Sequence, residues 1–206
     1  ALPFGLSVAI YMSEVANSRI RNLLKPIIEL LSGIPSVVYG FFGLIVIVPF
    51  IQKVFNLPVG ESGLAGSIVL AIMALPTIIT VTEDAMRNCP RAMREASLAL
   101  GASQWQTIYK VVIPYSVSGI TSGVVLGIGR AIGETMAVLM VTGNAAVIPH
   151  TILEPLRTIP ATIAAELGEA PAGGAHYEAL FLLGVVLFFI SLLINFTVEA
   201  VSARKR

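Results

Sequence analysis

Residues 88–114, with the sequence NCPRAMREASLALGASQWQTIYKVVIP, form a polar stretch between two long apolar segments. Pro90 indicates a helix start, because proline is favoured at or near the first helical position. Gly101 indicates a stop, since glycine readily takes the left-handed conformation that ends many helices. Ser103 followed by Gln106 is the pattern of a capping box, which begins a second helix. The stretch is therefore predicted to form two short helices separated by Gly101.

The first of these helices, expected over residues 91–100, has two different faces. Its small side chains are Ala92, Ala96 and Ala99, and its charged ones include Arg91, Arg94 and Glu95. A short helix with a small face and a charged face suits insertion into a groove of a partner protein. We therefore interpret residues 84–114 as a docking element for a soluble partner; the alternative is a solvated loop without a partner.

The composition favours a protein embedded in lipid. The chain has 206 residues, of which 56% are hydrophobic and only 12% are charged, whereas soluble domains carry roughly 25% charged residues. The net charge of +1 gives no general attraction to nucleic acid, so no nucleic-acid partner is expected. The single cysteine, Cys89, cannot form an internal disulfide and is interpreted as a small apolar filler.

Four apolar windows are long enough to cross a bilayer, which takes about 20 residues. They cover residues 27–51, 64–82, 115–141 and 179–198, and a shorter fifth window covers residues 2–13. The chain begins Ala1-Leu2-Pro3 without a methionine, so the fifth window is interpreted as a truncated span. The predicted fold class is an all-α membrane protein, a polytopic helical bundle with five spans of an expected six, in one domain covering residues 1–206.

The basic residues between the windows predict the orientation. Ten of them fall on one side and two, Lys53 and Arg157, on the other. The ten are Arg19, Arg21, Lys25, Arg87, Arg91, Arg94, Lys110, Arg204, Lys205 and Arg206. Since cytoplasmic loops carry the excess of Lys and Arg, residues 84–114 and the C-terminus are predicted to be cytoplasmic, and residues 142–176 to face outward.

Small residues and prolines within the windows predict close packing and kinks. A ridge with a four-residue spacing consists of Gly119, Gly123, Gly127 and Ala131. Such a ridge lets neighbouring helices approach closely. Pro35 and Pro76 are interpreted as kinks whose freed carbonyls are satisfied by neighbouring groups.

Arg130 and Glu134 are two charges inside the fourth window. Arg130 lies about 15 residues beyond Tyr115, or roughly 22 Å along a helix, and a charge at such a depth costs about 2.5–3.5 kcal/mol or more. A spacing of four residues places both side chains on one helix face, where they can pair. Two interpretations stay open: an ion pair that locks the bundle, or a transport pathway in which the planar guanidinium binds an oxyanion.

The block Glu95-Ala96-Ser97-x3-Gly101, followed by Ile113-Pro114, resembles the EAA loop of ABC importer permeases. Ser97 stands where that family usually has alanine. The resemblance implies a MetI-like permease fold and a coupling helix that docks on a cytoplasmic ABC ATPase dimer. The residues that it assigns to this coupling are Arg94, Glu95, Ala96, Ser97, Gly101 and Pro114.

Two further blocks, residues 33–40 (GIPSVVYG) and 130–135 (RAIGET), resemble the phosphate-specific permeases of this family. Residues 136–138, 141–144, 156–158 and 161–164 resemble the PstC type more than the PstA type. The resemblance implies a transport pathway with Arg130, Glu134 and Thr135, and a location in the inner membrane of a prokaryote. It also implies a second, PstA-like permease subunit and an extracytoplasmic phosphate-binding protein as partners.

Other functions are weaker interpretations of the same residues. A permease for another oxyanion, such as sulfate or molybdate, is the nearest alternative. An intramembrane enzyme that uses Arg130 and Glu134 as acid and base is the alternative from a different class. His150 and Glu154 have the spacing of two metal ligands but lack a third. No nucleotide-binding motif occurs, so neither a cofactor nor ATP hydrolysis by this chain itself is expected.

Overall fold

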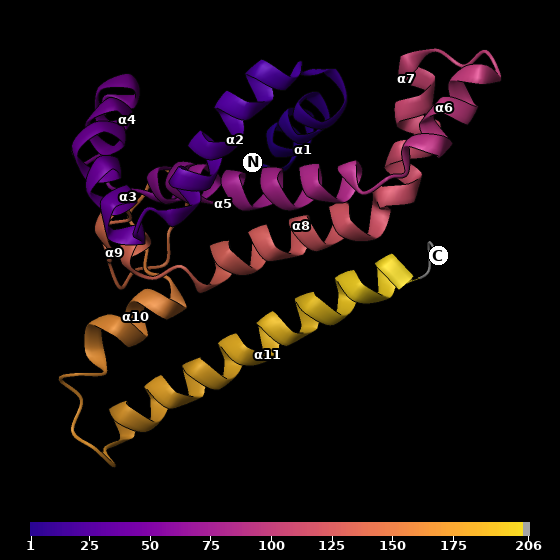
Figure 1. Cartoon of the computed structure of the whole chain (residues 1–206). Coiled ribbons are helices and arrows are strands. Elements are labelled where there is room, and N and C mark those ends of the chain that lie inside the picture. The colour runs from indigo at the N-terminus through magenta and orange to yellow at the C-terminus, as the bar shows by residue number, and fades with distance from the viewer. Residues whose placement is uncertain (204–206) are drawn as a thin grey trace. The chain divides into compact units, whose positions relative to one another are not determined.

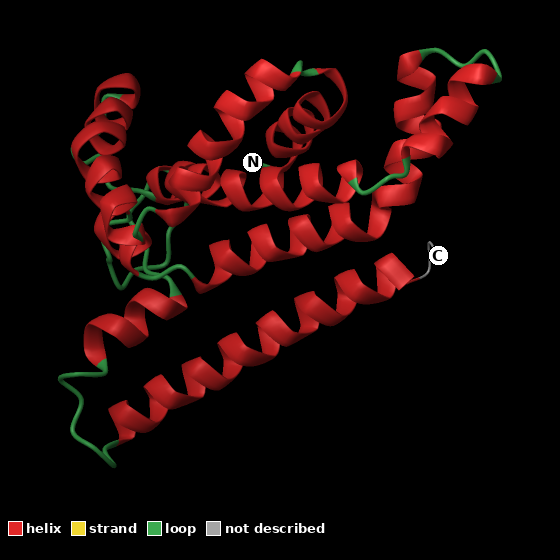
Figure 2. Ribbon diagram, in the orientation of Figure 1, coloured by secondary structure: helices red, strands yellow, loops and turns green. Residues whose placement is uncertain are grey.

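The computed structural model describes residues 1–203 and consists of helices and connecting loops, with one isolated bridge between Gly143 and Leu156 (Figure 2). Arg204, Lys205 and Arg206, predicted to be cytoplasmic, lie outside the described residues. The helical elements, several of them labelled in Figure 1, are α1 (Leu2–Ile10), the π-helical turn η1 (Tyr11–Val15), α2 (Ser18–Gly33), α3 (Ser36–Phe42), the π-helical turn η2 (Gly43–Ile47), α4 (Val48–Phe55), α5 (Gly63–Arg87), α6 (Arg91–Ala99), α7 (Gln104–Thr107), the π-helical turn η3 (Ile108–Val112), α8 (Ile113–Gly133), α9 (Met136–Val141), α10 (Ile159–Glu166) and α11 (Ala175–Ala203).

The contacts within the chain divide it into two compact units. The first unit comprises Ala1–Gly33, Ala74–Gly129 and the segment from Ile194 onward, and the second comprises Ile34–Met73 and Arg130–Leu193. Each unit has its own buried hydrophobic cluster. The single domain expected from the sequence stays a prediction.

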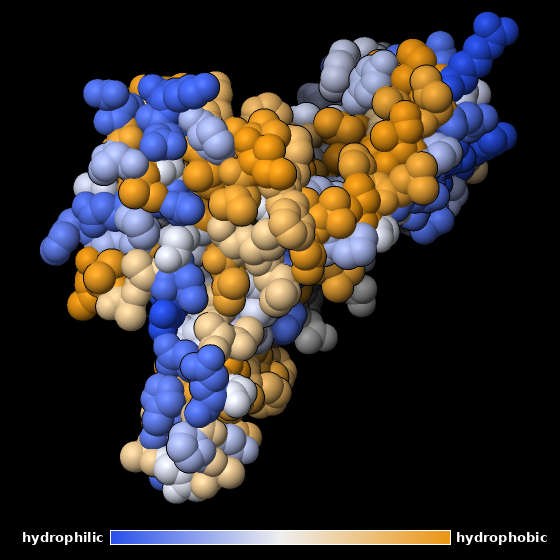
Figure 3. All heavy atoms as spheres, turned by 90° about the vertical axis from the view of Figure 1, so that its left-hand side faces the viewer, coloured by the Kyte–Doolittle hydropathy of each residue, from blue (hydrophilic) through white to orange (hydrophobic). Residues whose placement is uncertain are grey.

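Four helical segments are long and apolar enough to cross a membrane. They are Ser36–Phe55, Gly63–Arg87, Gln104–Gly133 and Ala175–Thr197, and a shorter apolar helix covers Leu2–Val15. The apolar window of Ala175–Thr197 is only 6% buried, and hydrophobic side chains cover much of the face in Figure 3. Exposed apolar surface of this extent needs lipid or a partner, which confirms the predicted class of a helical membrane protein.

The predicted span over residues 27–51 is wrong in its bounds, because the helix is interrupted before Pro35. Helix α2 ends at Gly33, and α3 begins at Ser36 after Pro35, which has an extended ψ of 142°. Proline disfavours helical backbone at the residue before it and has no N–H to donate. The expected kink is therefore a full break, and Glu29 lies exposed on α2 rather than inside a span.

The predicted span over residues 115–141 is also interrupted. Helix α8 ends at Gly133, and α9 begins at Met136 after Thr135, the residue that precedes it with φ −116° and ψ −60°. The apolar segment instead extends backward, since Gln104–Gly133 forms one long segment that includes α7, η3 and α8. The second helix of the polar stretch thus continues directly into the span.

The ridge was predicted to let neighbouring helices approach closely, and within the first unit its glycines, Gly119, Gly123 and Gly127, pack α8 against α5. The two helices run side by side in Figure 1. A Cβ atom added to Gly119 would lie 2.3 Å from Cβ of Ala85, and one added to Gly127 would lie 2.5 Å from Cγ1 of Ile78. Neither position has room for a side chain. Cys89 is buried beside Met86 and Val112, which confirms its role as an apolar filler.

In the second unit, α3 packs on α9 through Gly40, whose added Cβ would lie 3.0 Å from Cα of Ala137. The segment after α9 folds back over the start of α5, where Gly63 N donates to Glu154 O at 3.1 Å and Leu64 N to Ile152 O at 2.7 Å.

The carboxylate of Glu154 accepts a hydrogen bond of 2.7 Å from the backbone N–H of His150. This bond lowers the pKa of Glu154. Across residues 1–203, no group of three or more side chains is placed to hold a metal ion. The spacing of His150 and Glu154 therefore reflects a local loop contact.

Candidate functional site

The polar stretch folds as two capped helices. Helix α6 ends at Ala99, one residue before the predicted end, and Gly101 takes the left-handed conformation with φ +83°. Ser103 Oγ accepts a hydrogen bond from Gln106 N at 3.3 Å, and Ser103 N donates to Gln106 Oε1 at 2.8 Å. The predicted glycine stop and capping box are both confirmed, and α6 and α7 lie side by side in Figure 1.

Ser97 joins these two helices. Its hydroxyl lies 2.9 Å from the hydroxyl of Thr107, which is 5% exposed. An alanine, the residue usual at this position in the EAA loop, could not form this bond. The Ser97 hydroxyl therefore links α6 to α7 by a hydrogen bond, in addition to the covalent turn at Gly101.

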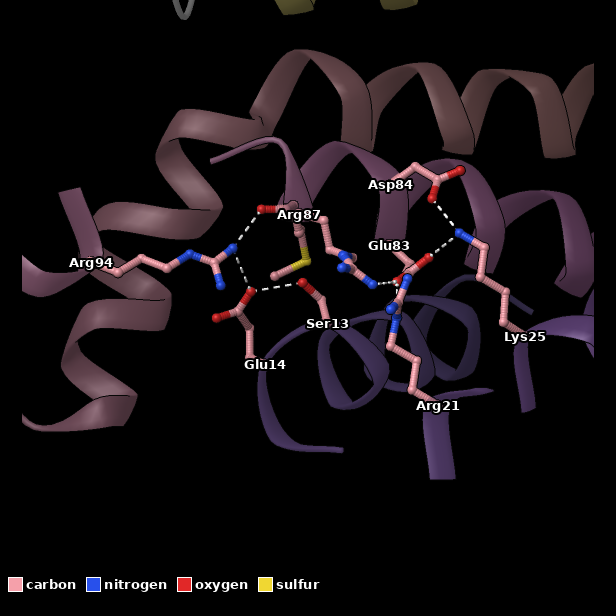
Figure 4. A network of polar contacts seen from close by, with 9 residues as sticks. Ser13, Glu14, Arg21, Lys25, Glu83, Asp84, Arg87 and Arg94 are labelled. Atoms are coloured by element: carbon pink, nitrogen blue, oxygen red, sulfur yellow. Dashed lines mark hydrogen bonds and ion pairs between the residues drawn. The ribbon is translucent and has the colours of Figure 1, made fainter. Parts of the chain in front are cut away.

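Arg94 points into the chain and anchors the base of α6. Its Nη2 donates to Met86 O at 2.8 Å and lies 3.0 Å from Glu14 Oε1. Glu14 is 7% exposed and also accepts a hydrogen bond from Ser13 Oγ at 2.7 Å. Figure 4 shows this chain of contacts, which fixes α6 to the end of α5 and to η1.

The outer surface of the two helices is exposed. Glu95, Ala96, Gly101 and Pro114 lie at the surface. Apolar side chains accompany them, with Leu100 exposed to 90% and Trp105 to 66%. The six residues assigned to coupling thus fall into two groups: Arg94 and Ser97 hold the helices in place, and the other four are accessible to a partner.

An ion-pair network around Glu83 lies in the same unit (Figure 4). Glu83 is 1% exposed and lies 2.8 Å from Arg21 Nε, 2.9 Å from Lys25 Nζ and 3.6 Å from Arg87 Nη1. Lys25 also pairs with Asp84 at 2.5 Å. Burial by itself lowers the pKa of Lys25, but the hydrogen bonds with Asp84 and Glu83 outweigh it and raise this pKa above its usual value.

The sequence analysis missed this network. The available signal was two acidic residues at the end of a predicted span, together with the basic residues Arg21 and Lys25 in a segment predicted to lie on the same side of the membrane. The signal was hidden because part of α2 was assigned to a membrane span. Helix α2 instead lies against α5 through its basic residues, so it positions the end of α5 from which the docking stretch begins.

Arg130 and Glu134 lie on the two sides of a break in the helix. Glu134 lies beyond the end of α8, and its Oε1 accepts a hydrogen bond of 3.3 Å from Ala137 N. The break after Gly133 removes the continuous helix face from which their pairing was predicted.

All three residues assigned to the pathway are half-buried in the second unit. Arg130 interacts electrostatically with Tyr39 of α3. Thr135 Oγ1 donates to Gly133 O at 3.3 Å. Residues 34–40 and 130–135, which are at least 90 positions apart in the chain, belong to the same structural unit.

Helices long and apolar enough to span a membrane, breaks within two of the apolar segments and an anchored polar two-helix stretch between two of them are features of a polytopic membrane protein. The chain belongs to the family described as the binding-protein-dependent transport system inner membrane component, whose model matches residues 1–206. It is therefore a multi-pass inner-membrane protein.

The curated relatives carry permease names. The "Probable ABC transporter permease protein YqgH" of Bacillus subtilis (strain 168) is 43% identical over 100% of this chain and 67% of its own length. The "Phosphate transport system permease protein PstC" of Mesorhizobium japonicum is 38% identical over 94% of this chain and 65% of its own length. The chain spans about two thirds of the length of these relatives.

Solved permease structures share the fold. One structure of the MetNI methionine ABC transporter in an inward-facing conformation matches with a TM-score of 0.76 at 20% identity, over 99% of this chain and 87% of the matched chain. A bacterial ABC transporter that imports the acidic polysaccharide alginate matches with a TM-score of 0.69 at 18% identity, over 98% and 72% of the two chains. These matches confirm the predicted MetI-like fold.

Proposed function

We propose that this chain is a permease subunit of an ATP-driven importer of inorganic phosphate. The family, and relatives named phosphate transport system permease protein PstC, support this function. In this proposal ATP is hydrolysed by a separate cytoplasmic ABC ATPase dimer. A second, PstA-like permease completes the membrane part, and an extracytoplasmic phosphate-binding protein delivers phosphate to the outward residues 142–176.

The observation that carries the proposal is the construction of α6 and α7. Arg94 and Ser97 hold these helices from within at 2.8–3.0 Å, while Glu95, Ala96 and Leu100 remain exposed. Because the internal contacts hold α6 and α7 together, a movement of a partner bound to their exposed residues can be transmitted to α5 without α6 and α7 unfolding. The distribution of basic residues supports a cytoplasmic location for the exposed residues of α6 and α7.

Arg130, Glu134 and Thr135 are proposed to contribute to the phosphate pathway. A guanidinium offers a planar set of donors that matches phosphate oxygens. Charged residues inside membrane segments are costly and mark substrate paths in many transporters. In this proposal Glu134 shapes the helix break beside Arg130, because its Oε1 accepts a hydrogen bond from Ala137 N at the start of α9.

ATP-dependent uptake of radiolabelled phosphate into liposomes, with the ATPase, second permease and binding protein present, tests the proposal. Wild-type protein is expected to accumulate phosphate in preference to sulfate and molybdate. Preference for sulfate or molybdate would instead support the alternative oxyanion permease. Uptake that does not require the ATPase would contradict the proposal.

A pair of matched variants tests whether the exposed face of α6 binds the ATPase. Ala96→Asp is expected to abolish co-purification of the ATPase, because a carboxylate replaces a small exposed residue on the docking face. Ala172→Asp makes the same change at an exposed position of the second unit and is expected to retain the ATPase. Equal retention by both variants would show that α6 is not the docking element.

A further inference from the structure

A polar pocket of about 210 Å³ lies within the first unit, at the base of the docking stretch. Four arginines line it, Arg21 of α2, Arg87 of α5, and Arg91 and Arg94 of α6, together with the hydroxyl-bearing residues Ser13 and Ser18. Figure 4 shows Arg21, Arg87 and Arg94 gathered around Glu83 and Glu14. Elements from distant parts of the sequence thus bring guanidinium groups to one cavity.

The acidic residues near the pocket do not balance its basic ones. Glu14, Glu83 and Asp84 pair with the lining arginines and Lys25. Five basic side chains, the four arginines and Lys25, therefore meet three acidic ones, which leaves a formal excess of two positive charges. Arg91 forms no ion pair among the described residues.

One of the arginines that line the pocket also has a donor without an acceptor. The Nε of Arg94 is buried, and no protein group accepts its hydrogen bond. A buried donor without an acceptor is costly and rare in folded proteins. The pocket therefore has an excess of positive charge, and one of the arginines that line it has a buried Nε without a hydrogen-bond partner.

We propose that this pocket binds a phosphate group, either free inorganic phosphate or the phosphate of an anionic lipid headgroup. Free inorganic phosphate carries a charge of about −1.5 to −2 near neutral pH, and the phosphodiester of a lipid headgroup is singly charged, so either anion offsets part or all of the formal excess of two. Arginine forks and serine hydroxyls are suitable donors for its oxygens.

A phosphate in this pocket would connect α6 with α2 and α5. Arg91 and Arg94 would hold it from the docking stretch, and Arg21 and Arg87 from the other two helices. Occupancy would therefore stiffen the base of α6. This inference does not depend on the transported substrate, because it concerns a site remote in sequence from Arg130 and within the other unit.

Binding of radiolabelled inorganic phosphate to the purified full chain in phosphatidylcholine nanodiscs provides the first test. Arg91→Gln is the test variant, because Arg91 is exposed and holds no ion pair whose loss would perturb the fold. Arg19→Gln is the matched control, since Arg19 is exposed on α2 outside the pocket. Arg91→Gln is expected to weaken phosphate binding about tenfold, the effect of losing one charge-assisted hydrogen bond, and Arg19→Gln to leave it unchanged.

The second arm distinguishes the two sources of phosphate. Nanodiscs with phosphatidylglycerol are used, and the lipid retained by the protein is measured by native mass spectrometry. Loss of retained phosphatidylglycerol in Arg91→Gln, without Arg91-dependent binding of free phosphate, assigns the pocket to a lipid headgroup. Arg91-dependent binding of free phosphate assigns it to the inorganic ion.

Two results would overturn the proposal. One is that neither free phosphate nor phosphatidylglycerol binding depends on Arg91. The other is that Arg91→Gln weakens only the capture of the ATPase, which would show that a carboxylate of the partner fills the pocket. Arg130→Gln is expected to retain the Arg91-dependent binding, so failure of the proposed transport pathway would leave this test unaffected.

Discussion

Arg94 and Glu14 form an ion pair of 3.0 Å that fixes the base of α6 to the π-helical turn η1. The two residues are 80 positions apart in the chain, and Glu14 is almost fully buried. Arg91, one turn earlier on the same helix, has no ion pair among residues 1–203. Neighbouring arginines of α6 thus have different roles, one in holding the helix and one available to a ligand.

Replacement of Arg94 by alanine is expected to loosen α6. The change leaves Glu14 buried without its cation and Met86 O without its donor, at a cost of about 1–3 kcal/mol. Hydrogen exchange of the amides of residues 91–99 should become faster, and the unfolding temperature in detergent should fall. Arg91→Ala is the matched control and is expected to change stability by less than about 0.5 kcal/mol; equal effects of both variants would contradict the anchoring role.

The network at Glu83 predicts a difference between two neighbouring carboxylates. Glu83→Gln removes the charge that three cations share at a site only 1% exposed, and is expected to destabilise the protein by about 1–3 kcal/mol. Asp84→Asn removes a single contact from a side chain that is 52% exposed, so less than about 1 kcal/mol is expected. Unfolding temperatures of both variants in the same detergent check the ranking, and a larger loss in Asp84→Asn would refute it.

The raised pKa of Lys25 predicts a loss of stability in alkaline solution. Because the pKa in the folded protein lies above the unfolded value of 10.5, the stabilisation is fully present below pH 10.5 and is lost as the pH rises through the folded value. Unfolding of wild-type protein is measured from about pH 9 to about pH 12. Lys25→Met should lack part of this alkaline decline, whereas Lys53→Met, at an exposed position, should retain it.

Local sequence patterns were sufficient to predict the two helices within residues 88–114. The positive φ at Gly101 and the capping box at Ser103 depend on residues within one helical turn, so composition at those positions determines them. The ridge of glycines in α8 was likewise predictable, since a four-residue period places all of them on one face. Its partner helix, α5, could be identified only from the structure.

Contacts between residues far apart in the sequence, and breaks within apolar helices, could not be predicted from local sequence patterns. Arg21 and Glu83 are 62 positions apart, and no local pattern connects them. A hydropathy window averages over residues and so does not register a break such as the one between Gly33 and Ser36. The same averaging concealed the end of α8 at Gly133, and with it the separation of Arg130 from Glu134.

The packing of α8 on α5 predicts opposite results for one substitution at two glycines. Gly119→Ala would place a methyl group 2.3 Å from Cβ of Ala85, and since neither group can rotate away, the helices must separate at a cost of about 1–3 kcal/mol. Gly129→Ala meets nothing within 4 Å and should stabilise the helix by up to about 1 kcal/mol. The unfolding temperatures of the two variants test this prediction, and a Gly119→Ala protein that is more stable than wild type would contradict the close packing.

The final prediction concerns Arg130 and Glu134. If they formed a structural pair, neutralising both would restore stability lost in each single variant. Because Glu134 caps α9 at Ala137 N, the stability effects of Arg130→Gln and Glu134→Gln are expected to add within about 0.5 kcal/mol. Glu134→Gln keeps an oxygen for the cap, whereas Glu134→Ala loses it and should cost about 1 kcal/mol more.

Transport should respond differently from stability. The double variant Arg130→Gln with Glu134→Gln is expected to insert, assemble and retain the ATPase, yet to lose phosphate uptake per assembled complex. The cause would be the missing guanidinium, so Arg130→Gln alone should lose most of the uptake and Glu134→Gln less. The measurements are a double-mutant cycle of unfolding temperatures and ATP-dependent uptake normalised to assembled complex. Near-wild-type uptake in the double variant would exclude Arg130 from the pathway and leave the charge with a structural role only.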